Sequence, residues 1–180
     1  MNINKKQILI SIPVLFIFGT MLHFLFNISG NIKIIGLIAP VNESVWEHLK
    51  LAFFPILVWW IFKISQEGLN NKYKKLIALA VSSILSICTI ISFFYTYTGA
   101  FGIKSLVLDI FSLFLGILIG QIIAYYTFIY LDVKKSYVCI SVIAIMTILI
   151  LFFIFTFYPP NIPLFKDPKT GFYGIFSTIL

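Results

Sequence analysis

Two histidines and three carboxylates in this sequence have the residue types and positions for metal or acid–base chemistry. They are His23, Glu43, Glu47, His48 and Asp109, and they are the candidate catalytic residues. Imidazole nitrogens and carboxylate oxygens are ligands that suit Zn, Mn or Fe. The candidate ligands of a divalent metal such as Zn are His23, Glu47, His48 and Asp109. Glu43 is the candidate general base.

The segment that holds both glutamates also has a purely structural interpretation. The spacing Ser44-x-x-Glu47 matches a capping box, a pattern that satisfies backbone donors at the start of a helix. If the segment is helical, Glu43, Glu47 and Lys50 share one stripe, and either acid can pair with Lys50. No HExxH or Glu-x-x-His spacing is present. Helix capping and metal binding therefore both stay open for these residues.

Asp109 belongs to a stripe of small and polar residues within a long apolar segment. At helical spacing the stripe consists of Ser105, Asp109, Ser112, Gly116, Gly120 and Thr127. The Gly116-x-x-x-Gly120 pattern allows two membrane helices to approach closely. We therefore expect the stripe, and Asp109 with it, to face the interior of a helix bundle. There Asp109 can accept hydrogen bonds from Ser or Tyr side chains or from His23.

The composition indicates that these residues are positioned by helices in a membrane. Of 180 residues, 61% are hydrophobic and 11% are charged, whereas soluble proteins carry roughly 25% charged residues. Five apolar runs are each near the ~20 residues that cross a bilayer as a helix. The predicted spans are residues 8–28, 46–62, 76–97, 103–130 and 137–158. The sequence thus predicts an all-α, multi-pass integral protein of a cell membrane, with a single domain over residues 1–180.

The positions of the lysines predict how the spans are oriented. Cytoplasmic segments of membrane proteins carry an excess of basic residues. With the N-terminus inside, the inner segments hold eight lysines, namely Lys5, Lys6, Lys63, Lys72, Lys74, Lys75, Lys134 and Lys135. The outer segments hold five, namely Lys33, Lys50, Lys104, Lys166 and Lys169. We therefore expect an N-in/C-out bundle of five transmembrane helices. Both histidines and a proline-rich tail, residues 159–180, then lie on the outer side, and residues 175–180 are a candidate interfacial piece.

The net charge of +7 does not indicate a nucleic-acid partner. All 13 basic residues are lysines, and positive flanks of membrane spans explain their places at the ends of apolar runs. Arginine, the residue best suited to bidentate contacts with phosphate, does not occur in the sequence. We expect the partners to be the lipid bilayer and a lipid, peptide or protein at the outer face.

Two motifs in the sequence resemble those of a known family. VNESxWEHLK occupies residues 41–50, and PPxIPLFxDPxTGxYG occupies residues 159–174. Both are similar to signatures of a family of small bacterial polytopic membrane proteins that is described as a domain of unknown function. The resemblance extends over essentially the whole chain. It implies the membrane fold and a pairing of the outer mouth with the tail, and it implies no activity, substrate or cofactor.

Three classes of function fit these observations. An accessory, sensor or binding protein fits the small size of the chain and its compact polar group on the outer side. A metal-dependent hydrolase acting on a lipid or small amphiphile would use that group to hold a metal and activate water. A small-solute transporter would use the polar stripes within residues 76–97 and 103–130. The sequence favours the accessory, sensor or binding protein, and the hydrolase and the transporter are the alternatives.

Overall fold

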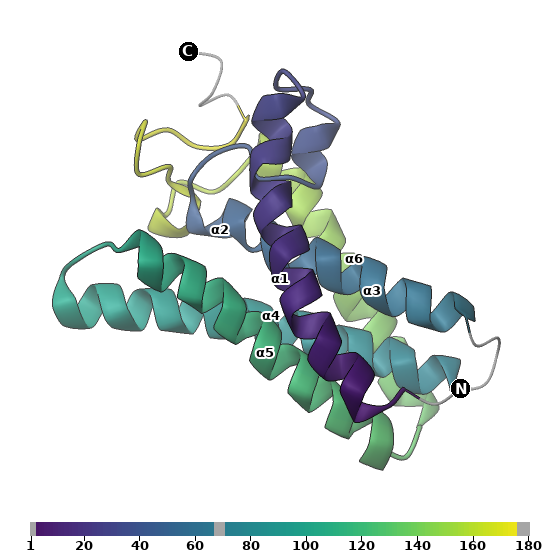
Figure 1. Cartoon of the computed structure of the whole chain (residues 1–180). Coiled ribbons are helices and arrows are strands. Elements are labelled where there is room, and N and C mark those ends of the chain that lie inside the picture. Colours follow the sequence, from purple (N-terminus) through teal and green to yellow (C-terminus); the bar gives the residue numbers. More distant parts are fainter. Residues whose placement is uncertain (1–2, 67–70, 176–180) are drawn as a thin grey trace.

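The described residues, 3–66 and 71–175, form a bundle of helices in the computed structural model (Figure 1). In chain order the elements are α1 (Lys5–Ile28), η1 (Ile35–Leu37), α2 (Val45–His48), α3 (Lys50–Gln66), α4 (Lys72–Phe101), α5 (Leu106–Tyr130), α6 (Lys135–Phe157) and η2 (Pro163–Phe165), where η denotes a short 3-10 helix. These residues contain no strand, and one isolated antiparallel bridge joins Lys166 to Tyr173. The all-α prediction is confirmed for the described part of the chain.

Within the described residues, five helical segments are long and apolar enough to cross a membrane, with α2 and α3 forming one segment, Val45–Gln66. Each predicted span overlaps one of these segments, with ends that differ by up to four residues, as at both ends of α4. This architecture is consistent with a multi-pass membrane protein. The predicted interfacial piece at 175–180 lies outside the described residues apart from residue 175.

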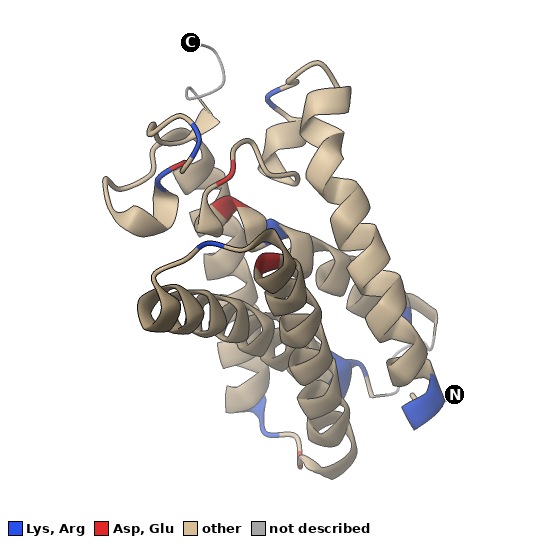
Figure 2. Ribbon diagram, turned by 60° about the vertical axis from the view of Figure 1, so that its left-hand side comes forward, with Lys and Arg blue, Asp and Glu red and all other residues tan. Residues whose placement is uncertain are grey.

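Two long segments outside the long helices meet at one end of the bundle, which we call the loop end. Residues 29–44 follow α1, residues 158–175 follow α6, and the two lie side by side in Figure 1. The Asn42 amide donates to the Gly174 carbonyl at 3.1 Å. The Trp46 ring lies 5.0 Å from the Phe152 ring of α6 and 4.9 Å from the Phe165 ring of η2. Figure 2 shows most acidic positions at this end, away from the N-terminus.

Glycines on α5 determine how closely α5 approaches α4. A Cβ at Gly116 would lie 2.9 Å from the Ser86 carbonyl oxygen, and one at Gly120 would lie 2.6 Å from the Ser82 carbonyl oxygen. The Ser86 hydroxyl donates to the Gly116 carbonyl at 2.9 Å, so the close approach also permits an interhelical hydrogen bond. The part of the stripe that holds Gly116 and Gly120 therefore packs against α4, as the Gly-x-x-x-Gly spacing predicts.

A third glycine brings α1 close to α3. A Cβ at Gly19 would overlap the Leu51 carbonyl oxygen. Because Pro55 has no N–H, that carbonyl lacks the hydrogen bond that residue 55 would otherwise donate within α3. Gly19 lets α1 pack against this carbonyl. Since His23 lies one turn further along α1, the contact holds His23 near the start of α3.

Gly120→Ala is expected to destabilise the bundle. The new methyl group would crowd the Ser82 carbonyl oxygen at 2.6 Å, so α4 and α5 must shift apart at the cost of about 1–3 kcal/mol typical of overpacking. Gly99→Ala in α4 is the matched control, because no neighbouring element of the described structure lies within 4 Å of a Cβ there. Thermal unfolding in one detergent compares the two variants, and equal melting temperatures would contradict the close contact of α4 with α5.

Candidate metal centre

His23, Glu43 and His48 form a group that can hold a metal ion. One nitrogen of each imidazole and one carboxylate oxygen of Glu43 all lie within 4.8 Å of one another. All three side chains are half-buried, and the two imidazole rings are 5.1 Å apart between centroids. Ligands bound to one tetrahedral Zn²⁺ at about 2.0–2.2 Å stand about 3.4 Å apart. Small side-chain rotations therefore suffice to bring these three ligand atoms onto one ion.

The N-terminal cap of α2 decides which glutamate joins the two histidines. The Ser44 hydroxyl accepts a hydrogen bond from the Glu47 N–H at 3.3 Å, so the helix begins at Val45. Ser44 itself has extended backbone angles, with φ −70° and ψ 152°, as an N-cap residue requires. Glu43 therefore precedes the helix, and its carboxylate lies beside His48, at the end of the same short helix.

Both nitrogens of His48 face oxygen atoms. Nδ1 lies 2.8 Å from the Ser44 carbonyl oxygen, and Nε2 lies 3.4 Å from a carboxylate oxygen of Glu43. A neutral imidazole has only one N–H, so it can satisfy only one of these oxygens. Either a doubly protonated ring or a cation between Nε2 and the carboxylate would satisfy both oxygens. A backbone carbonyl that accepts from the other nitrogen is a common way to orient a metal-binding histidine.

His23 supplies a second nitrogen in need of a partner. Its Nδ1 is buried and has no hydrogen-bond partner among the described residues. A buried polar atom without a partner costs free energy. A metal ion bound at this nitrogen would remove this cost.

Glu43 has the charge state that a metal ligand needs. Its pKa is lowered from an ordinary 4.5 to about 2, chiefly by the hydrogen bond with His48 and, against the opposing effect of partial burial, by a hydrogen bond from Lys169. The Lys169 ammonium lies 2.9 Å from the carboxylate, and the same contact raises the pKa of Lys169. Glu43 is thus ionised at neutral pH, which spares a metal the cost of displacing a proton from it.

Glu43→Gln is expected to remove a pH-dependent part of the stability. Because folding lowers the pKa of Glu43 to about 2, the carboxylate stabilises the fold fully above its ordinary pKa and progressively less as the pH falls from about 4.5 to about 2. In chelator-treated protein, the difference in melting temperature between wild type and Glu43→Gln should be near its full size at about pH 5. A difference that has already vanished at that pH would contradict the ion pairing of Glu43.

Glu47 lies in a different cluster from the histidines. Its carboxylate accepts hydrogen bonds from the Val41 N–H at 3.0 Å and from the Lys50 ammonium at 2.6 Å. Lys50 also donates to the Gly36 carbonyl at 2.8 Å and to the Thr156 hydroxyl at 2.7 Å. The Glu47 and Lys50 side chains are 2% and 0% exposed. The structure therefore does not bring Glu47 into the metal group that the sequence proposed, because a buried lysine neutralises it and ties it to α6.

Asp109 is not a member of the metal group but lies next to it. Its carboxylate accepts a hydrogen bond from the Tyr97 hydroxyl at 2.6 Å, so the expected tyrosine partner is confirmed. Asp109 and Glu43 line one cavity of about 240 Å³. The Asp109 carboxylate is also close enough to His48 to interact with it electrostatically. Of the four metal ligands expected from the sequence, His23 and His48 lie in the metal group. The carboxylate of that group comes from Glu43 and not from Glu47. Asp109 lines the adjoining cavity.

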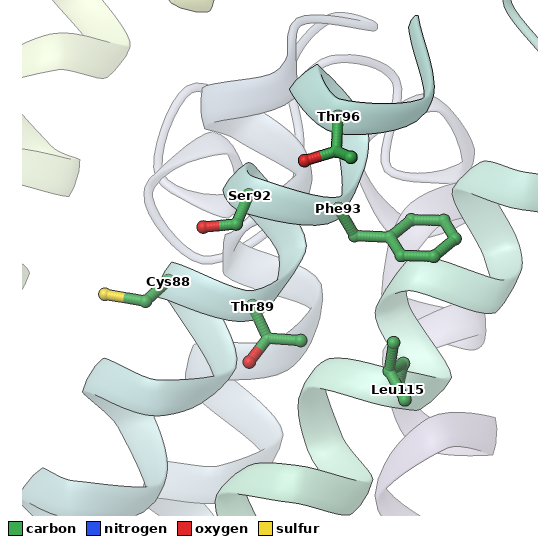
Figure 3. Close-up of a pocket in the computed structure, with 6 residues that line it drawn as sticks. All are labelled: Cys88, Thr89, Ser92, Phe93, Thr96 and Leu115. Carbon is green, nitrogen blue, oxygen red and sulfur yellow. The ribbon is translucent and has the colours of Figure 1, made fainter. Parts of the chain in front are cut away.

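A second hollow lies on α4 and α5, apart from these residues. It is lined by Cys88, Thr89, Ser92, Phe93, Thr96 and Leu115 (Figure 3). Phe93 and Leu115 lie on its apolar side, and Cys88 and Ser92 point away from Leu115 (Figure 3). Since its lining includes neither histidine nor a carboxylate, this hollow is not a candidate for the acid–base or metal chemistry considered above.

The comparisons with known proteins bear on the chain as a whole. A family model described as a family of unknown function, DUF6512, matches residues 1–175. The chain belongs to the DUF6512 family. This assignment confirms the resemblance to an uncharacterised family. No curated protein and no solved structure matches the chain, so the chemistry of this DUF6512 protein has to be inferred from its own residues.

Proposed function

We propose that this DUF6512 protein is a membrane hydrolase that binds one divalent metal ion, Zn²⁺ in the first instance, and acts on a lipid or small amphiphile. The observation that carries the proposal is the convergence of His23, Glu43 and His48 within 4.8 Å, beside a cavity that Glu43 also lines. Two histidines and one glutamate are a ligand set of catalytic zinc sites, in which the remaining position is open to water.

Asp109 is the proposed general base of this reaction. A zinc ion held by His23, Glu43 and His48 would supply a bound water whose pKa is lowered to about 7, and Asp109 would accept the proton that this water loses. The water oxygen forms a bond to the carbonyl carbon or phosphorus of an ester as the bond to the leaving oxygen breaks. The proton on Asp109 then passes to that leaving oxygen, which departs as an alcohol. The Tyr97 hydroxyl, 2.6 Å from the carboxylate, orients it.

The proposal places the loop end on the outer side of a cell membrane. Five apolar helical segments of the described residues support membrane insertion. The excess of lysines on the predicted inner segments supports an N-in/C-out orientation. In that orientation the metal group lies near the outer surface of the bilayer, where water and the ester groups of lipids are both accessible.

Metal content and turnover, measured on one preparation, test this function. Protein stripped by a chelator and reloaded with zinc is expected to retain about one ion per chain and to hydrolyse members of a panel of short-chain fluorogenic esters. Asp109→Asn is expected to keep the ion and to lose turnover by about 10²–10⁴-fold, the usual contribution of a general base. Asp132→Asn, which changes an acid between α5 and α6, is the control. Turnover that persists without metal would contradict the proposal.

A second candidate function is a non-catalytic binding or sensor protein. The observation that favours it is the attachment of the tail to the VNESxWEHLK motif, through Lys169 on Glu43 at 2.9 Å and Asn42 on Gly174 at 3.1 Å. Together the motif and the tail make one composite surface that can receive a partner. Zinc retention without turnover on any ester of the panel would favour this candidate over the hydrolase.

A further inference from the structure

The cavity next to the metal group carries two lysines that the proposed hydrolysis does not use. They are Lys104, in the segment between α4 and α5, and Lys166, in the segment after α6. Both line the same space as Glu43 and Asp109. Charged residues from the segment before α2, from the start of α5 with the segment that precedes it, and from the segment after α6 thus line one small volume.

The balance of charge in this cavity depends on the metal ion. Lys104 and Lys166 contribute two positive charges, and Glu43 and Asp109 contribute two negative ones. Lys169, which pairs with Glu43 at 2.9 Å, brings the sum to +1. Adding a divalent ion at Glu43 brings the sum to +3. A phosphate monoester carries about −1.5 to −2 charges at neutral pH, which matches this sum better than the single charge of a carboxylate does. Lysine, the basic residue of this chain, binds phosphate as a point charge.

The remaining walls of the cavity are largely apolar. Val45, Phe94, Tyr95 and Pro163 are among its lining residues. The volume of about 240 Å³ is below the ~300–1,000 Å³ of sites that enclose a whole drug-sized ligand. A headgroup with the first part of an attached chain suits this space, and the rest of the chain must lie outside it. Tyr95 of the cavity lining is 41% exposed, so part of this apolar wall is open to the surroundings.

We propose that this cavity binds the phosphate group of an anionic amphiphile, with Lys104 and Lys166 contacting the phosphate and the apolar walls contacting the adjoining chain. The proposal rests on the proposed function, because the metal ion at His23, Glu43 and His48 supplies most of the positive charge at the cavity. It names the substrate class of that site as a phosphate-bearing lipid or amphiphile.

Binding of three matched probes tests the proposal on the full-length chain in a maltoside detergent, which carries no phosphate. The probes are dihexanoyl phosphatidic acid, dihexanoylglycerol and inorganic phosphate, titrated calorimetrically onto zinc-loaded protein. Phosphatidic acid is expected to bind at least about tenfold more tightly than either of the other two, because only it offers both the charge and the chains. Equal binding of the neutral glyceride, or equal binding of inorganic phosphate, would overturn the proposal.

Lysine variants assign the binding to the cavity. Lys104→Ala and Lys166→Ala are each expected to weaken binding of phosphatidic acid by about threefold, and the double variant by about tenfold, as for partly solvated charge pairs. Lys104→Arg keeps the charge and should bind nearly as well as wild type. Lys33→Ala is the matched control, since Lys33 is an exposed lysine outside the cavity lining. Unchanged affinity in the double variant would also overturn the proposal.

A zinc titration of the same variants separates the two proposals. Zinc affinity in the lysine variants should stay within about twofold of wild type, because neither lysine belongs to the metal group. If zinc binds and phosphatidic acid does not, the cavity proposal fails and the metal proposal stands. If zinc does not bind but phosphatidic acid still requires the two lysines, the metal proposal fails and the phosphate site stands on its lysines.

Discussion

His48→Ala is expected to abolish stoichiometric zinc binding. The variant removes one of the two imidazoles of the metal group, and with it the nitrogen that faces Glu43 at 3.4 Å. Loss of groups that merely support a zinc ligand costs about 10–100-fold in affinity, so loss of the ligand itself should exceed about 100-fold. His48→Gln keeps most of the side-chain volume and should lose zinc as well. The measurement is metal per chain after equilibrium dialysis.

The same loss should appear in thermal unfolding. Zinc at about 100 times its dissociation constant stabilises a folded chain by about 2.7 kcal/mol. For a protein of this size, that stabilisation raises the melting temperature by about 5–10 °C. Wild type should show the rise and lose it on addition of a chelator, whereas His23→Ala and His48→Ala should melt at the same temperature with and without zinc.

Glu47→Gln provides the matched contrast for these histidine variants. It changes a carboxylate of the same VNESxWEHLK motif, but one that contacts Lys50 and lies outside the metal group. Its stability should fall while its zinc stoichiometry stays near one. If Glu47→Gln lost zinc as completely as His48→Ala at a temperature where both are folded, the assignment of Glu43 as the third ligand would be wrong.

Lys50→Ala is expected to have the largest effect on stability, about 3–5 kcal/mol, which is the usual cost of removing one partner of a buried ion pair. The variant leaves the Glu47 carboxylate, 2% exposed, without its cation. It also removes the hydrogen bonds from Lys50 to the Gly36 carbonyl and to the Thr156 hydroxyl. Of the polar contacts between the motif and α6, the variant then keeps the longer hydrogen bond from the Thr156 hydroxyl to Glu47, at 3.4 Å. Unfolding in a denaturing detergent titration measures the change.

The double variant Glu47→Gln with Lys50→Met tests whether the buried charge causes that loss. Replacing both partners removes the uncompensated carboxylate, and such replacements are often close to neutral in stability. The double variant should therefore be clearly more stable than Lys50→Ala alone. Equal destabilisation of the two would indicate that packing around Lys50, and not its ion pair with Glu47, holds the motif in place.

Much of the fold can be predicted from the sequence, because the length of each apolar run is enough to predict a membrane-spanning helix. Each predicted span coincides with a helical segment of the described residues. The contact of α5 with α4 was also readable, since Gly116 and Gly120 are four residues apart and lack side chains that would separate the helices. The ends of α4 were not readable in the same way. Polar residues such as Lys72 and Thr98 extend this helix beyond its apolar part.

The metal group was predicted in part. Its carboxylate ligand differs from the prediction because the helix begins at Val45, after Glu43. A continuous helix over residues 40–50 would place Glu43 and Glu47 on one stripe, but Ser44 caps the helix and leaves Glu43 before it. The cap at Ser44 was one of the two interpretations open from the sequence, and it is the one that separates the two acids. The contact between Glu47 and Lys50 at i, i+3 was among the expected alternatives, and the structure contains it.

The contacts between the motif and the tail depend on tertiary structure. Lys169 reaches Glu43 across 126 residues of sequence, and the amide of Asn42 reaches Gly174 across 132. Periodicity within a helix carries no information about such pairs. Lys104 and Lys166 likewise come together only because the segment between α4 and α5 and the segment after α6 line one cavity.

X-ray absorption at the zinc edge of the zinc-loaded protein tests the central claim most directly. The account predicts about one ion per chain, with a first shell of nitrogen and oxygen at about 2.0–2.1 Å and the outer scattering of two imidazoles. That imidazole scattering should be halved or lost in His23→Ala and His48→Ala. Protein that retains no zinc above the level of these variants, or a zinc shell with no imidazole scattering, would contradict the account.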